Sequence, residues 1–223
     1  MCARYDGMTK TAAKTVTQHR LPEFEPEADR REPSSLAELN TLLKEIKPMV
    51  HGGCRAVLGE GPIGAPLALV GEQPGDQEDM QGHPFVGPAG RLLDRALEAA
   101  GVERQDTYVT NAVKHFKYEQ RGKRRIHQKP TVTEVKRYRW WLLKELEFVH
   151  PHVVVALGAT AALALTGAPV VISRTRGPAR FGPFRGFITV HPSSLLRQQD
   201  EAARAASYDA FVRDLKKSAR LAA

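Results

Sequence analysis

The sequence has few cysteines and no long apolar run. Only two of its 223 residues are cysteines, Cys2 and Cys54, so it excludes a framework of several disulfides and a zinc site built only from thiolates. No window approaches the ~18 consecutive apolar residues of a membrane-spanning helix. Because the chain also begins without the basic and then apolar order of a signal peptide, we expect a cytoplasmic protein with no membrane partner.

Positive charge is concentrated in one part of the chain. The formal net charge is +8, and residues 112–144 alone hold eleven basic and two acidic side chains. Residues 36–111, by contrast, hold six basic and eleven acidic ones. A run of charge is most often a solvated face, but basic density on this scale favours a polyanionic partner.

The apolar pattern predicts a single domain that follows an arm. Residues 1–33 lack apolar periodicity and are expected to form a flexible arm, whereas residues 34–223 form the domain. Apolar spacing predicts helices near 36–46, 88–100, 131–148, 158–165 and 201–221, and strands near 67–70, 108–110, 153–157 and 187–190. This alternation indicates an α/β fold: a three-layer α/β/α arrangement around a central, mostly parallel sheet of four strands.

Four residues directly follow the predicted strands, namely Gly71, Asn111, Gly158 and His191. Ligands of such sheets bind beyond the carboxyl ends of the strands. We therefore expect the polar residues after these strands to meet in one cleft.

The first two loops combine glycine, proline and side chains suited to a flat ligand. The acidic loop Gly71–Asp79 can point backbone N–H groups at an anion or a carbonyl oxygen, although it could equally be a surface turn. Its four carboxylates argue against a phosphate cradle. Phe85, held between prolines and glycines, can stack on a flat ring or fill the core. The amide of Asn111 can pair with the edge of a base or cap a turn.

Two later segments combine histidine with phosphate-binding groups. In the first, Lys123, Arg124 and Arg125 precede His127 and can hold its ring near a phosphate, or form an exposed basic loop. In the second, residues 191–197, the histidine can donate to a developing oxyanion and the serines can hold a phosphate. One leucine there, Leu195 or Leu196, could wedge into a base stack, or both could belong to the core.

In this order, the segments 71–79, 83–90, 110–111 and 191–197 resemble the uracil-DNA glycosylase superfamily, nearest its family 4, over residues 57–215. The segment Lys123–His127 is in addition similar to a loop of the UdgX branch, whose members excise uracil and then stay covalently attached to the DNA. Glu72 and the acidic run 76–79 also suit that branch.

The resemblance implies a uracil pocket and a reacting pair. Phe85 would stack on a flipped uracil, and Asn111 would read its polar edge. The backbone of Gln73 would help to stabilise negative charge on the departing ring, and Asp76 would also belong to the uracil-binding residues. The catalytic residues would be Glu72, which faces the cationic sugar, His127, which attacks it, and His191, which stabilises the departing ring. The DNA-binding residues would be Lys123, Arg124, Arg125, Ser193, Ser194 and Arg197. The first three would hold both the loop and neighbouring phosphates, so that His127 lies close to the reacting carbon.

The sequence departs from the family 4 pattern that it resembles at the positions that bind iron. Family 4 proteins normally carry a four-iron, four-sulfur cluster, yet the segment His51–Arg55 has one cysteine instead of a pair. Two further cysteine positions of the family fall on His115 and near Tyr138. We therefore expect no cluster, no other cofactor and no metal, with a metal at His51, Cys54 and His115 as the weaker alternative.

We expect an enzyme of the bacterial cytoplasm, active at the nucleoid. A monomer is the default expectation, and the sequence leaves the oligomeric state open. Its partner would be uracil-containing DNA, single-stranded or with the base flipped from a duplex. Three alternatives remain at this point: an ordinary multiple-turnover glycosylase, a non-catalytic binder of uracil or abasic DNA, and a generic nucleotide-binding domain. The sequence leaves the strand preference and the range of bases open.

Overall fold

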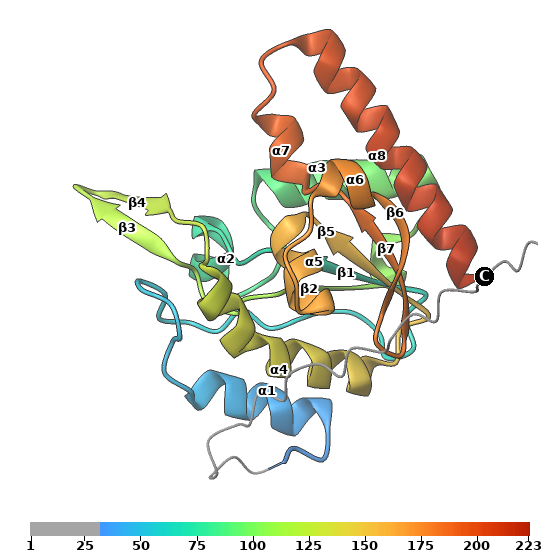
Figure 1. Cartoon of the computed structure of the whole chain (residues 1–223). Coiled ribbons are helices and arrows are strands. Elements are labelled where there is room, and N and C mark those ends of the chain that lie inside the picture. Colours follow the sequence, from blue (N-terminus) through green and yellow to red (C-terminus); the bar gives the residue numbers. More distant parts are fainter. Residues whose placement is uncertain (1–31) are drawn as a thin grey trace, which may run out of the picture.

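The structure, a computed structural model, describes residues 32–223. Figure 1 shows a central sheet covered by helices on both faces, with a separate hairpin standing away from the body. The three-layer α/β/α fold expected from the sequence is therefore confirmed. The predicted arm, residues 1–33, lies almost wholly outside the described residues.

Five strands form the sheet, in the order β2-β1-β5-β7-β6. They are β1 (Leu67–Gly71), β2 (Thr107–Asn111), β5 (Val153–Leu157), β6 (Gly177–Phe181) and β7 (Phe184–Thr189). Only β6 runs antiparallel, on the edge beside β7. The sequence predicted four strands because β6 contains Pro178 and polar residues, a composition tolerated at an edge but unlike the apolar runs of the central strands.

Two groups of helices cover the sheet. On one face lie α1 (Leu36–Glu45), α4 (Val132–Val149) and α5 (Ala159–Thr166), and on the other lie α3 (Pro88–Ala100) and α8 (Glu201–Ala222). The shorter helices are α2 (Asp76–Gln81), α6 (Ile172–Thr175), α7 (Pro192–Leu196) and the 3₁₀ turn Arg104–Asp106. No helix within residues 32–223 has both the length and the apolar character needed to cross a membrane.

Strands β1 and β5 are apolar throughout because both of their faces are buried. In β1, Leu67 and Leu69 pack toward α3 and α8, whereas Ala68 and Val70 pack toward α1 and α4. Successive side chains of a strand point to opposite faces, so a strand covered on both sides needs apolar residues at every position. This requirement explains why β1 and β5 were recognisable as unbroken apolar runs.

A buried ion pair joins the end of β2 to α4. Lys114 Nζ contacts the Glu145 carboxylate, and neither side chain is exposed. The Tyr108 hydroxyl donates to Glu145 Oε1 at 2.9 Å, and the Thr110 hydroxyl donates to the same oxygen at 3.1 Å. Burial raises the pKa of Tyr108, with the Glu145 charge adding to the effect, so the phenol stays a donor. The network fixes the chain on both sides of Asn111.

The polar, basic stretch that the sequence left without structure is a hairpin. Its strands, β3 (Tyr118–Arg121) and β4 (Arg124–His127), pair antiparallel, with Tyr118 opposite His127. Gly122 in the turn has a φ of +57°, which glycine adopts readily. The pattern hid the hairpin because most of its side chains are exposed and supply no apolar alternation.

Candidate active site

A cavity of about 820 Å³ opens at the carboxyl ends of the parallel strands. Residues at the carboxyl end of β2 and directly after β1, β5 and β7 line it, which confirms the convergence predicted from the sequence. The predicted site residues on its wall are Glu72, Gln73, Asp76, Phe85, Asn111, His127, His191, Ser193, Ser194 and Arg197. Lys123, Arg124 and Arg125 lie outside this lining.

An aromatic shelf forms one wall of the cavity. Phe85 is 6% exposed, and its ring stacks on that of His191 with the centroids 6.2 Å apart. Its φ of +58° is unusual for a residue other than glycine. The close packing of α3 supports this conformation, because a Cβ at Gly90 would lie 1.7 Å from the Phe85 carbonyl oxygen. The local glycines therefore hold the ring at the cavity.

Asn111 presents its amide beside that ring. The side chain is buried at the end of β2, and no hydrogen-bond partner for it occurs within residues 32–223. A Cβ at Gly71 would lie 2.3 Å from Asn111 Oδ1 and 2.5 Å from Phe85 Cζ, so the absence of a side chain at Gly71 makes room for both groups. A buried amide that lines a cavity can give its donors and acceptor to a ligand.

His191 is held as a neutral donor. Burial lowers its pKa to about 4, with Glu72 opposing the shift and the charge of Arg197 adding to it. The Ser193 backbone N–H donates to Nδ1 at 3.2 Å, and the Ser193 hydroxyl lies 2.8 Å from the same atom. Nδ1 therefore acts as the acceptor, and the proton sits on Nε2. A neutral Nε2–H suits the stabilisation of negative charge in the cavity.

Glu72 lies between two elements and contacts both. Its Oε2 accepts a hydrogen bond of 2.5 Å from the Thr160 hydroxyl on α5. Its Oε1 lies 3.4 Å from Nε2 of His127, which closes the hairpin side of the cavity. The two side chains are 22% and 50% exposed, so the pair faces the open part of the cavity. Sequence reasoning missed Thr160, although it lies only two residues after Gly158.

The side chain of Gln73 fastens the base of the hairpin. Its amide nitrogen donates to the carbonyl oxygens of Lys117 and Gln128 at 3.2 and 3.1 Å. Its amide oxygen accepts from the Lys117 backbone N–H at 3.1 Å. These three bonds grip the residues on either side of β3 and β4 and so determine where His127 lies.

Arg125 has a different position from the one expected of a phosphate ligand. Its guanidinium binds Asp76 Oδ1 at 2.5 Å and contacts Asp79, a carboxylate that is 5% exposed. The same group lies over the rings of Phe116 and Tyr118, 5.5 and 5.2 Å from their centroids. Arg125 thus anchors the hairpin to α2, because its donors are directed to protein carboxylates.

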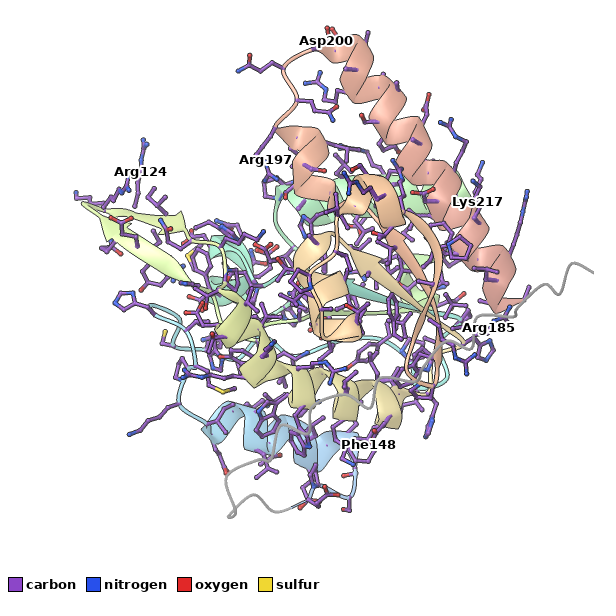
Figure 2. All side chains as sticks on the ribbon, in the orientation of Figure 1. Arg124, Phe148, Arg185, Arg197, Asp200 and Lys217 are labelled. Carbon is purple, nitrogen blue, oxygen red and sulfur yellow. The ribbon has the colours of Figure 1, made fainter. Side chains whose placement is uncertain are left out.

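The remaining cations are free to meet a large ligand. Lys123 and Arg124 are exposed at the hairpin turn, and Figure 2 places Arg124 at its tip, directed away from the body. Directly after α7, Arg197 donates to the Ser193 hydroxyl at 3.1 Å and lines the cavity. The structure also separates the two leucines, since Leu195 is 1% exposed whereas Leu196 is 43% exposed on the cavity wall.

Two residues at or near positions that the family resemblance assigns to cluster ligands, His115 and Tyr138, form a hydrogen-bonded pair. His115 Nδ1 lies 2.6 Å from the hydroxyl of Tyr138, and that hydroxyl accepts from the Met49 backbone N–H at 3.0 Å. Burial lowers the pKa of His115 to about 4 and raises that of Tyr138. No group of three potential metal ligands gathers anywhere in residues 32–223. These residues do not fit a cluster.

Comparisons with known proteins agree with this geometry. The family model of the uracil DNA glycosylase superfamily matches residues 58–216. The Type-4 uracil-DNA glycosylase of Thermotoga maritima is 39% identical over 160 residues, which cover 70% of this chain and 80% of that protein. The Type-4 enzyme of Pyrobaculum aerophilum is 33% identical, over 73% of this chain and 85% of its own.

A third relative, from Archaeoglobus fulgidus, is also named a Type-4 uracil-DNA glycosylase and is 41% identical, over 48% of this chain and 50% of its own. The region that the family model matches, residues 58–216, contains every strand of the central sheet and every residue placed on the cavity wall. The chain belongs to the uracil-DNA glycosylase superfamily.

Proposed function

We propose that this protein excises uracil from DNA and then attaches itself to the resulting sugar through His127. The observation that carries the covalent part is the placement of His127 Nε2 3.4 Å from Glu72 Oε1, inside the cavity that holds Phe85 and Asn111. The relatives named as Type-4 uracil-DNA glycosylases support the excision itself.

Base recognition uses the aromatic shelf and the free amide. A uracil that has left the base stack, from a single strand or a duplex, stacks on Phe85 and pairs its polar edge with Asn111. The exposed Leu196 enters the space that the base vacates, whereas the buried Leu195 stays in the core. Lys123, Arg124 and Arg197 contact phosphates of the same strand.

Cleavage of the glycosidic bond separates charge, and the site has groups for both signs. The bond between the sugar C1′ and uracil N1 breaks, and its electron pair leaves with the base. His191 Nε2–H donates to the uracil oxygen on which negative charge develops, because its low pKa keeps the ring neutral. The Glu72 carboxylate stabilises the positive charge at C1′.

The covalent step follows at the same carbon. The Glu72 carboxylate, which lies within reach, takes the proton from His127 Nε2, and the electron pair of the broken N–H bond forms the new bond between Nε2 and C1′. Gln73 and the Arg125 contacts with α2 hold the hairpin so that the imidazole, rather than water, meets C1′. Because the new bond joins protein and DNA, each molecule reacts once.

The test is incubation with a labelled uracil-containing single strand, analysed on a denaturing gel. We expect a heat-stable band of protein joined to DNA, formed in at most one copy per protein molecule. His127→Ser should release uracil without forming that band, and a strand with thymine in place of uracil should give neither product. Uracil release beyond one equivalent without a joined band would identify an ordinary hydrolytic glycosylase. Binding without any release would identify a non-catalytic binder.

We also propose that the protein works without an iron–sulfur cluster. The buried pair of His115 and Tyr138 supports this, because it occupies cluster positions with groups that bind each other. Purified under anaerobic conditions, the protein should contain less than about one tenth of an iron atom per chain and lack the broad visible absorption of a cluster. Near four iron atoms per chain, with that absorption, would overturn the proposal.

A further inference from the structure

The turn between β5 and α5 forms a wall of the cavity to which the proposed reaction assigns no group. Thr160, in the first turn of α5, is 3% exposed and lines the cavity. Its hydroxyl donates to Glu72 Oε2 at 2.5 Å, and no other side-chain partner for it occurs among residues 32–223. A buried hydroxyl directed at a carboxylate in the cavity calls for a functional account.

The hydrogen bond distinguishes the two oxygens of Glu72. Thr160 occupies Oε2, which leaves Oε1 facing His127 Nε2 at 3.4 Å. The terminal torsion of a glutamate is broad, so a carboxylate without such a partner samples many orientations. A donor fixed on a helix therefore holds the plane of the carboxylate where the second oxygen meets the imidazole and the sugar.

The same turn also determines the position of His191. Gly158 has a φ of +91°, and a Cβ at this position would lie 2.9 Å from His191 Cβ. Its backbone N–H donates to the Thr189 carbonyl oxygen at 2.9 Å. The turn from Gly158 to Thr160 thus contacts the carboxylate expected beneath the sugar and the histidine expected beside the departing base.

We propose that Thr160 is a positioning residue. It orients the Glu72 carboxylate both for cleavage of the glycosidic bond and for bonding of the sugar C1′ to His127. This inference rests on the proposed function. The hydroxyl itself need not touch the DNA, because it acts through Glu72. We therefore expect loss of the hydroxyl to slow the chemical steps and to leave DNA binding unchanged.

Two substitutions separate the hydroxyl from the bulk of the side chain. Thr160→Val keeps the shape and removes the donor, whereas Thr160→Ser keeps the donor. With protein in excess over a uracil-containing single strand, we expect Thr160→Val to lower the maximal rates of uracil release and of adduct formation about tenfold or more. The protein concentration at half-maximal rate should stay within about twofold, and Thr160→Ser should retain nearly the full rate.

The same substitution made in a Glu72→Gln protein distinguishes a role through the carboxylate from a general effect on folding. If Thr160 acts through the carboxylate, then Thr160→Val should have little further effect on the rate in a Glu72→Gln protein. An equal loss in both backgrounds, an unchanged rate in Thr160→Val, or an equal loss in Thr160→Ser would overturn the inference. A wild-type protein that releases no uracil would instead refute the proposed function, so the two failures are distinguishable.

Discussion

Gly71 occupies the narrowest point between the two groups that are proposed to hold the base. The added Cβ atom of any other residue would lie 2.3 Å from Asn111 Oδ1 and 2.5 Å from Phe85 Cζ. Both atoms belong to side chains on the cavity wall, so a methyl group would displace them without disturbing the backbone of β1. At the residue scale, the positions of Phe85 and Asn111 therefore depend on the absence of a side chain at Gly71.

Gly71→Ala should therefore lower the rate of uracil excision by about 100-fold, because displacement of a contact by about 1 Å can have that effect. Single-turnover uracil release measures it. Gly64→Ala is the matched control: nothing lies within 4 Å of the added methyl, but the φ of +75° costs about 1 kcal/mol of stability. Excision at the wild-type rate by Gly71→Ala would contradict the argument.

The buried pair of Lys114 and Glu145 affects the stability of the fold. The Lys114 ammonium and the Glu145 carboxylate are both fully buried, so Lys114→Met leaves an uncompensated charge in the core. We expect the free energy of unfolding in urea to fall by about 3–5 kcal/mol. The double variant Lys114→Met/Glu145→Leu should recover much of that loss, whereas no recovery would show that the pair itself provides the stability.

The β3–β4 hairpin is the element that distinguishes the proposed covalent reaction from plain hydrolysis. It carries His127 at the end of β4, and Gln73 grips its base through Lys117 and Gln128. Arg125 ties its middle to α2 through the carboxylates of Asp76 and Asp79. At the scale of the element, Arg125, one of the cations expected to hold both the loop and neighbouring phosphates, is directed to protein carboxylates and fastens the hairpin.

Arg125→Ala should thus change the fraction of excised sites that become adducts more than it changes the rate of uracil excision. Without the anchor, the hairpin samples more positions and water competes for C1′, so we expect the fraction of excised sites that become adducts to fall about tenfold. The measurement compares free abasic product with the joined band. Arg124→Ala, at the exposed tip, should weaken DNA binding at low salt, by an amount that shrinks as salt rises, but leave that fraction unchanged. Equal fractions in both variants would refute the anchoring role.

At the scale of the whole molecule, two neutral histidines connect stability to pH. Burial lowers the pKa of His115 and of His191 to about 4, below the usual value near 6.5. Between these values the unfolded chain binds protons that the folded chain does not, so protonation favours unfolding. The stability that each neutral histidine contributes is complete above about pH 6.5 and is lost as the pH falls toward 4.

The free energy of unfolding should consequently decrease by about 1.4 kcal/mol per pH unit for each histidine across that range. Urea denaturation from pH 7 to pH 4.5 measures the slope. His115→Gln removes one titrating group while keeping a hydrogen-bonding side chain beside Tyr138, and it should reduce the slope by that amount whatever its absolute stability. An unchanged slope would mean that His115 titrates normally.

The layers of the fold and the location of the site follow from the amino-acid sequence alone. The central strands were recognisable because burial on both faces demands apolar residues throughout, and the polar residues directly after them had to meet at one edge of a parallel sheet. The edge strand β6 and the hairpin escaped detection, since exposed strands carry no such pattern.

The partner of each polar side chain depends on how distant segments pack in the folded protein. The sequence contains Arg125, Gln73 and Thr160, but their partners lie 49, 44 and 88 positions away. A guanidinium that could bind phosphate is directed instead to two carboxylates, and a threonine without any motif fixes the orientation of Glu72. Hydrogen bonds and ion pairs depend on distances of a few ångströms between distant segments, and only the packed fold defines those distances.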